Sequence, residues 1–169
     1  MASFEVIGGN KLKGTIIPQG AKNEALQILS AVVLTDAEMT ISNIPNILDV
    51  NLLIELLVDM GVKVKQVDSH TYTFCADAIN VDYLSSENFR TKGGRLRGSV
   101  MLAGPMLARF KKAYIPKPGG DKIGRRRLDT HILGFEKLGA KPNEISVVNL
   151  SGRGDKDLAT YQEKLKLNQ

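Results

Sequence analysis

The sequence predicts an α/β (α+β) chain built from repeated βαβ-like units. Segments with apolar residues at helical spacing are interleaved with segments in which apolar and polar residues alternate, as in strands. A pattern of helix end, turn and strand occurs at 33–41 and again at 107–115. The chain has 169 residues, 43% of them hydrophobic, which is enough for one globular domain with a buried core.

The first expected element is a β-hairpin near the amino terminus. Residues 4–7 and 12–17 are short alternating runs that flank Gly8, Gly9 and Asn10. Glycine and asparagine readily adopt the backbone conformations of tight hairpin turns.

The next part of the chain, up to residue 76, alternates between helices and strands. Gly61 follows the second of two apolar helical segments, as is usual at a helix end. The expected elements are helices over 22–34 and 49–60 and strands over 38–42, 62–67 and 72–76.

The pattern restarts in the second half. We expect a helix over 97–110 despite Pro105, a strand over 113–115, and a helix over 130–138 that Gly139 ends. The two copies are offset by 74 residues at first and by 78 at their closing glycines. The added length falls in the loop 116–127, and extra length in one copy of a repeat is typical of a functional insertion.

Basic residues are concentrated in one segment. The net charge of the chain is +5, but residues 90–127 contain 12 Lys or Arg and a single acidic residue, Asp121. This local positive field suits an anionic partner such as a phosphate, a nucleotide sugar or a nucleic acid. The alternative is a solvated basic face that binds nothing.

The composition disfavours several classes of function. A single cysteine, Cys75, rules out an internal disulfide framework, and the two histidines are too far apart in sequence to suggest a metal-ligand cluster. No apolar run is long enough to cross a bilayer, and the first residues lack the pattern of a secretory signal. We therefore expect a cytoplasmic protein without a metal site.

Three local features favour the binding of anionic groups. The first is 20–23 at a helix start, where backbone N–H groups and Lys22 attract an anion. The second is 92–99, where glycines permit close approach and arginines offer bidentate donors. The third is 118–127, where Asp121 lies alone among cations and is a candidate proton donor or acceptor. Taken singly, each is also compatible with a solvated surface.

Seen together, a series of short motifs points to one family. The motifs are Gly20-Ala-Lys-Asn23 with Ala25-Leu26, Arg97, Ala103-Gly-Pro105 with Leu107-Ala-Arg109, Pro118-Gly-Gly120, Ile123-Gly124 and Leu128-Asp-Thr-His131. In this order they resemble the enolpyruvyl transferase family, and within it the UDP-N-acetylglucosamine 1-carboxyvinyltransferases.

The resemblance implies a partial inside-out α/β barrel of the enolpyruvyl transferase type. It implies transfer of the enolpyruvyl group of phosphoenolpyruvate to the 3-hydroxyl of UDP-N-acetylglucosamine, a step of peptidoglycan synthesis, by addition and loss of phosphate. No cofactor or metal would be needed. The partners would be these two substrates, and neither a nucleic acid nor a membrane.

The resemblance also implies roles for residues in all three features. Lys22 would contact the phosphate of phosphoenolpyruvate, and Asn23 would contact the sugar near the reacting hydroxyl. Arg97 and Arg126 would bind anionic groups, with Arg126 facing phosphoenolpyruvate.

Further roles fall in or just after the loop. Asp121 stands where most of the family has a cysteine, and it would deliver the proton while resisting the epoxide fosfomycin, since a carboxylate is a poorer epoxide nucleophile than a thiol. Leu128 and Asp129 would lie along the uridine. Arg127 replaces a proline common in the family and would contact the nucleotide.

The chain departs from the family in length and at its end. A complete member has two barrel domains, and its first strand pair normally belongs with the second domain. We expect 1–141 to be a partial enolpyruvyl transferase domain, and 142–169 to be an unrelated tail with a short strand and an amphipathic helix. Part of this tail, 147–157, resembles the carboxyl-terminal segment of the tryptophan synthase β subunit without the rest of its cofactor site.

Three hypotheses follow. The leading one is a truncated carboxyvinyltransferase that is inactive alone but retains weak affinity for a nucleotide sugar. The alternative is a non-enzymatic anion-binding or nucleic-acid-binding module that uses 90–127, although no aromatic residues are interleaved with its arginines as a stacking platform. The third is a poorly folded product of truncation. The oligomeric state is not indicated by the sequence.

Overall fold

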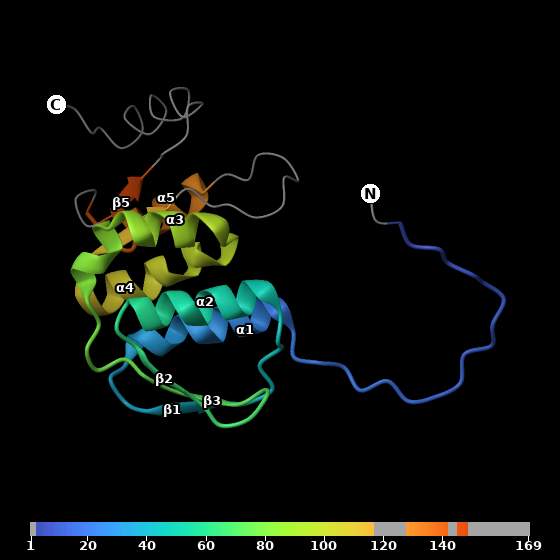
Figure 1. The fold of residues 1–169 in the computed structure, drawn as a ribbon. Helices are drawn as coiled ribbons and strands as arrows, with labels where there is room; N and C mark the ends of the chain where they lie inside the picture. The colour runs from blue at the N-terminus through green and yellow to red at the C-terminus, as the bar shows by residue number, and fades with distance from the viewer. Residues whose placement is uncertain (1–2, 117–127, 142–144, 149–169) are drawn as a thin grey trace.

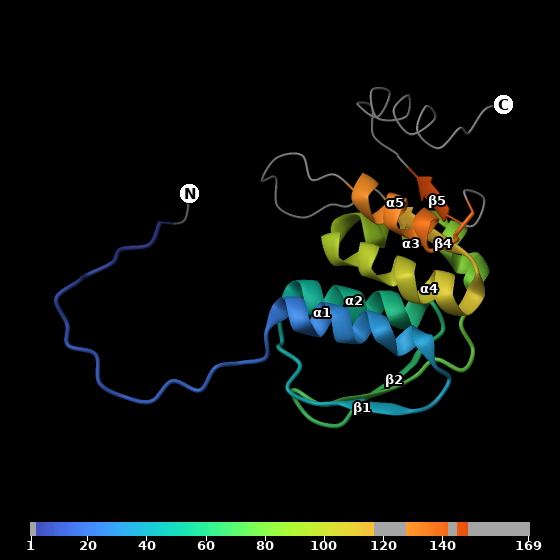
Figure 2. The same cartoon turned by 180° about the vertical axis from the view of Figure 1, so that it is seen from behind.

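The computed structural model describes residues 3–116 and 128–141 with their side chains, and the backbone of residues 145–148. Within these residues, helices lie between a three-stranded and a two-stranded sheet (Figures 1 and 2). The sequence-based prediction of a mixed helix and strand chain is confirmed. Closure into a barrel stays a prediction.

The three-stranded sheet belongs to the first repeat unit. Its order is β1 (Met39–Ile41), β3 (Tyr72–Cys75) and β2 (Lys63–Gln66), with both outer strands antiparallel to β3. Phe74 pairs with Met39 on one side and Val64 on the other, and it is fully buried. The sheet therefore buries one face, which α1 and α2 cover (Figure 1).

The two helices of this unit form where the apolar spacing predicts them. α1 (Lys22–Ala31) continues into a short 3-10 helix, η1 (Val32–Leu34), and α2 (Leu48–Asp59) follows β1. Their inward residues, among them Leu29 and Leu53, are fully buried. Gly61 adopts φ +99 after α2, and a Cβ there would lie 2.5 Å from the carbonyl oxygen of Ala78. The predicted helix end is confirmed.

The second unit repeats the order of the first. α4 (Ala103–Phe110), β4 (Ala113–Pro116) and α5 (Asp129–Lys137) correspond to α1, β1 and α2, and Gly139 with φ +95 follows α5 as Gly61 follows α2. β5 (Ile145–Val148) pairs directly with β4 in parallel. In the first unit the equivalent strands β1 and β2 are separated by β3.

The predicted helix over 97–110 is only partly correct. Residues 97–102 form a 3-10 helix, η3 (Arg97–Leu102), and the α-helix begins at Ala103. Pro105 has no N–H to donate to the carbonyl of residue 101, so an α-helix cannot run through this point without a break. Pro105 is instead tolerated in the first turn of α4.

Two elements before η3 were missed by sequence reasoning, η2 (Val81–Ser85) and α3 (Glu87–Arg95). Residues 92–95 are thus the end of a helix, not an open glycine loop. Ser86 caps α3 by accepting a hydrogen bond from the N–H of Phe89, 3.1 Å away, and Phe89 is buried. This cap and this buried ring outweigh the low helix propensity of the two glycines.

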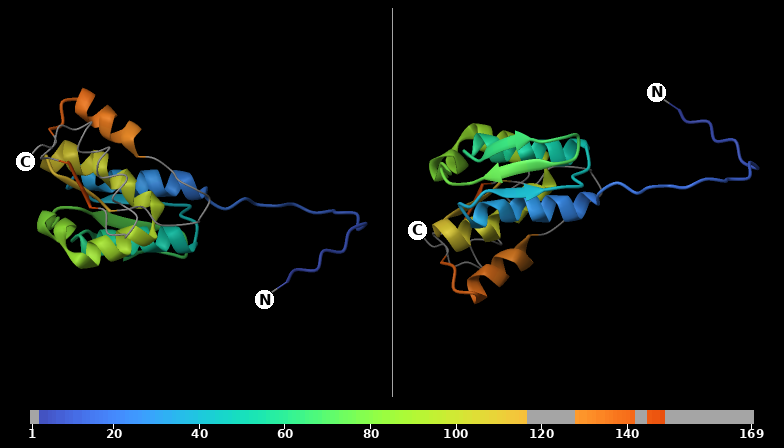
Figure 3. Two further views of the ribbon diagram at one scale, coloured as in Figure 1. Left: turned by 90° about the horizontal axis from the view of Figure 1, so that it is seen from above. Right: turned by 90° about the horizontal axis from the view of Figure 1, so that it is seen from below.

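The predicted amino-terminal hairpin is wrong in this structure. Residues 3–20 form no strand and extend away from the folded body (Figure 3). Six apolar side chains of this segment are 77–97% exposed: Phe4, Val6, Ile7, Leu12, Ile16 and Ile17. A lone two-stranded hairpin is marginal without a surface to cover its apolar face, and the described residues offer none here.

The strand β5, which pairs with β4, lies within the residues that the sequence analysis assigned to the tail. The amphipathic helix expected after it lies outside the described residues. The boundary at 141 stays a prediction.

Candidate substrate-binding site

Lys22 and Asn23 lie at the amino-terminal end of α1, where the sequence predicts an anion-binding position. A Cβ on the preceding Gly20 would lie 1.9 Å from the carbonyl oxygen of Asn43, so only glycine allows the chain to enter the helix here. No side chain caps α1. Lys22 forms an ion pair with Asp49, which lies in the first turn of α2. The first turns of α1 and α2 are therefore neighbours.

Arg97 begins η3 and lies next to α1. A Cβ on Gly98 would be 3.0 Å from the side chain of Leu26, one helical turn after Lys22. The hydroxyl of Ser99 is buried and lies 2.8 Å from the carbonyl oxygens of both Gly93 and Leu96, which fixes the corner between α3 and η3. Because this corner packs on α1, the backbone of Arg97 is close to the helix that carries Lys22 and Asn23. No carboxylate of the described residues forms an ion pair with Arg97.

Lys92, one of the cations of the segment 92–99, has a partner within the protein. Its ammonium forms an ion pair with Asp59 at the end of α2, and the hydroxyl of Tyr83 donates to the same carboxylate over 3.0 Å. Burial, and then the hydrogen bond to Asp59, raise the pKa of Tyr83 well above its ordinary value. The charge of Lys92 is thus already balanced within the protein.

Leu128 and Asp129 lie at the start of α5. The side chain of Leu128 is 5% exposed and belongs to the hydrophobic core, so it leaves little surface for a ligand. α5 packs on α4 where Phe135 contacts Gly104, since a Cβ on Gly104 would be 3.7 Å from the ring. The described contacts place α5 against α4 and do not join Asp129 to Lys22. Their contacts with uridine stay predictions.

Asp121, Arg126 and Arg127 lie outside the described residues. The residues on either side of this segment are buried: Pro116 ends β4, and Leu128 precedes α5. A Cβ on Gly93 would lie 2.8 Å from the ring of Pro116, so the end of β4 is packed against the α3 corner that precedes Arg97.

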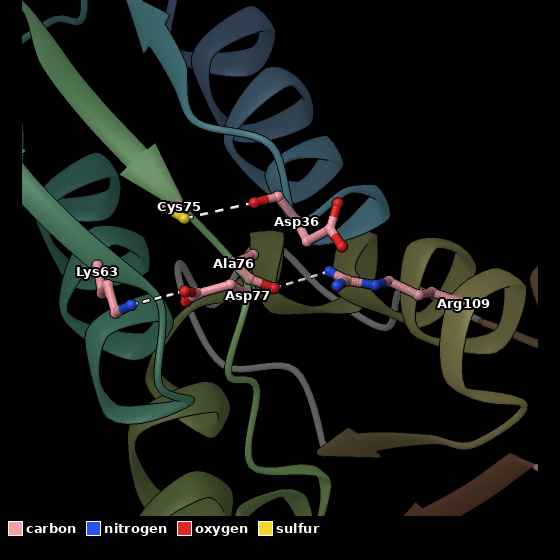
Figure 4. A network of polar contacts seen from close by, with 6 residues as sticks. All are labelled: Asp36, Lys63, Cys75, Ala76, Asp77 and Arg109. Atoms are coloured by element: carbon pink, nitrogen blue, oxygen red, sulfur yellow. Dashed lines mark hydrogen bonds and ion pairs between the residues drawn. The ribbon is translucent and has the colours of Figure 1, made fainter.

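Arg109 joins the two repeat units, a role that sequence reasoning missed. One guanidinium nitrogen donates to the carbonyl oxygens of Val33, Thr35 and Ala76 at 3.1, 3.0 and 2.8 Å. Figure 4 shows the side chain of Arg109 reaching from α4 to the end of β3. The sequence offered one indication: Arg109 lies in the second copy of the repeat at the position that Thr35 occupies in the first copy. These hydrogen bonds give Arg109 a structural role.

The described residues contain neither a candidate metal centre nor a membrane-spanning helix. No group of three or more His, Cys, Asp or Glu side chains among them is arranged to hold a metal ion. No helix of the described part is long and apolar enough to span a membrane.

Comparison with known proteins gives a consistent result. A family model described as EPSP synthase (3-phosphoshikimate 1-carboxyvinyltransferase) matches residues 6–157. UDP-N-acetylglucosamine 1-carboxyvinyltransferase of Porphyromonas gingivalis is 61% identical over 140 residues, which cover 83% of this chain and 32% of that protein. A protein of the same name from Bradyrhizobium diazoefficiens is 44% identical over 138 residues, covering 82% and 31%.

Among solved structures, the enolpyruvyl transferase NikO from Streptomyces tendae matches with a TM-score of 0.49 at 25% identity. The match covers 63% of this chain and 24% of that one. The chain spans about a third of the length of the curated relatives it matches.

Proposed function

The chain belongs to the EPSP synthase family of carboxyvinyltransferases, and on this premise we propose that it is the amino-terminal part of an enolpyruvyl transferase that uses phosphoenolpyruvate and UDP-N-acetylglucosamine. The observation that carries the proposal is 61% identity over 140 residues to a UDP-N-acetylglucosamine 1-carboxyvinyltransferase. The sequence motifs around Lys22, Arg97 and Leu128 fall within the family match.

Each described residue has a role that its chemistry suits. Lys22, at the uncapped start of α1, would meet the phosphate of phosphoenolpyruvate. Asn23 would hydrogen-bond the sugar near its 3-hydroxyl. Arg97, which no described carboxylate neutralises, would supply planar donors to a second anionic group. Asp129 would contact the uridine.

The loop residues complete the proposal. Asp121 would deliver a proton to the methylene carbon of phosphoenolpyruvate as the sugar hydroxyl adds to the neighbouring carbon. Arg126 would stabilise the phosphate that later leaves, and Arg127 would contact the nucleotide. We include fosfomycin insensitivity in the proposal because Asp121 offers no thiol to the epoxide.

The chain alone would not complete the reaction. The relatives are about three times as long, and a site for two anionic substrates needs groups held on both sides of a cleft. We therefore propose weak binding of the nucleotide sugar by the isolated chain and negligible turnover. The cytoplasmic location expected from the sequence remains a prediction.

Two measurements test this function. The first is calorimetric titration of the chain with UDP-N-acetylglucosamine, using Lys22→Met as the site variant and Lys65→Met, an exposed lysine on β2, as the matched control. Selective binding that persists at moderate salt supports the proposal, whereas binding of nucleic acid that falls steeply with salt supports the alternative module.

The second measurement uses a chimera. Residues 1–141 would be joined to the remaining two thirds of the Porphyromonas gingivalis relative, and phosphate release from phosphoenolpyruvate would be followed with UDP-N-acetylglucosamine present. Turnover by the chimera confirms the assignment. A folded chimera that ignores both substrates refutes it.

A further inference from the structure

The ion pair between Lys22 and Asp49 joins the starts of two helices. Lys22 is the first residue of α1, and Asp49 lies in the first turn of α2. Their side chains are 49% and 33% exposed, so a dissolved ligand can reach both. Sequence reasoning had assigned Lys22 a ligand and had given Asp49 no role.

Lys22 occupies a position that helix electrostatics disfavours. The amino-terminal end of a helix carries partial positive charge, and a lysine there is repelled by it. The N-cap residue of α1, Ala21, makes no side-chain hydrogen bond, so the free N–H groups keep their full effect. Conflicts of this kind between a local rule and the observed residue are expected at functional sites. In this structure the charge of Asp49 relieves the conflict.

The negative charge of Asp49 is favourable even without Lys22, because Asp49 lies in the first turn of a helix. A carboxylate in the first turn of a helix interacts well with the exposed N–H groups, and the N-cap residue of α2, Ile47, makes no side-chain hydrogen bond to them. Breaking the ion pair with Lys22 therefore destabilises the charge of Asp49 only slightly. Lys22, in contrast, lies at a position where an anionic partner is favourable.

We propose that Asp49 is a counter-ion that holds Lys22 while no ligand is bound and that a ligand phosphate displaces it from the lysine. The inference rests on the proposed function for the identity of the ligand, phosphoenolpyruvate, and adds a residue that sets the strength of its binding. A carboxylate beside the phosphate position repels the ligand as well as competing for the lysine. Removing its charge then strengthens binding, whereas removing a merely structural residue would weaken it.

The test measures binding of phosphoenolpyruvate and of inorganic phosphate to the full 169-residue chain by calorimetry. Asp49→Asn should bind both about two- to fivefold more tightly than the unmodified chain, the range expected for an exposed ion pair. Asp36→Asn, which makes the same change in net charge at an exposed position before β1, should leave both affinities unchanged. The double variant with Lys22→Met should lose the gain.

Each other outcome is decisive. Equal or weaker binding by a folded Asp49→Asn chain overturns the inference, as does absence of phosphate binding in every variant. If Asp49→Asn does not fold, Asp49→Ser must show the tighter binding, and failure of both to fold makes Asp49 structural and overturns it too. An inactive chimera combined with tighter phosphate binding would refute the proposed function alone. An active chimera without tighter binding would refute the counter-ion alone.

Discussion

Replacing Arg109 by methionine should destabilise the chain by about 3 kcal/mol, because one guanidinium nitrogen donates to three carbonyl oxygens at 2.8–3.1 Å. One nitrogen carries two N–H groups, so we count two well-directed bonds at about 1.5 kcal/mol each, the lower end for a charged donor. Methionine keeps the length and apolar character of the stem, which limits the loss to the polar contacts.

The assay is thermal and urea unfolding followed by circular dichroism. A loss of about 3 kcal/mol lowers the melting temperature of a domain of this size by roughly 6–12 °C. Arg109→Lys keeps the charge but lacks the planar guanidinium, so its melting temperature should lie between those of the unmodified chain and of Arg109→Met. The control Lys65→Met, at an exposed position, should change stability by less than about 0.5 kcal/mol.

The result that refutes this reasoning is a melting temperature for Arg109→Met within a degree or two of that of Lys65→Met. The contacts between the repeat units would then be carried by apolar packing alone, and the carbonyls of Val33, Thr35 and Ala76 would be satisfied without the guanidinium.

Three further predictions concern the site and its supports. In the chimera, Asp121→Ala should abolish phosphate release, whereas Asp121→Cys should retain it and become sensitive to fosfomycin, which an inactivation time course would show. Gly20→Ala should cost more than about 1 kcal/mol, since the new Cβ meets a backbone oxygen at 1.9 Å, while Gly8→Ala, with nothing within 4 Å, should be silent in the same unfolding assay. The pKa of Tyr83 is raised in the folded chain, so the unfolded chain loses the phenol proton first as the pH rises above about 10. The free energy of unfolding should therefore fall above this pH. In unfolding measurements at alkaline pH, Tyr83→Phe should remove this part of the fall.

Most of the helices and strands were predictable because their signals are local. The apolar spacing of α1 and α2 and the glycines at 61 and 139 act within one or two turns, and the structure places these two helices within a few residues of the prediction. The correspondence between the two units was also visible, because each unit needs the same order of apolar faces.

The elements that were wrong or missed depend on distant partners. The segment 3–20 has the alternation of a hairpin but no surface to cover it, so the pattern alone does not make strands. α3 contains two glycines and strong charge, yet it forms because Phe89 is buried and the end of β4 packs against Gly93.

In the candidate site, too, local features were predictable from the sequence and contacts with distant residues were not. The sequence identified the charged residues and, through their order, the family. It could not show that Lys92 is neutralised by Asp59 or that Lys22 is paired with Asp49, since both partners come from α2, which is far away in the chain.

By itself, the sequence determined the family, the kinds of side chain available for anion binding and the positions at which most helices and strands begin and end. These follow from local chemistry: which residues attract phosphate, which end a helix, and which repeat with a fixed period. Only the tertiary structure decided which cations of the described residues form ion pairs with a carboxylate and which do not. The reason is that an ion pair depends on the distance between two charges, and that distance is set by the packing of whole helices against one another.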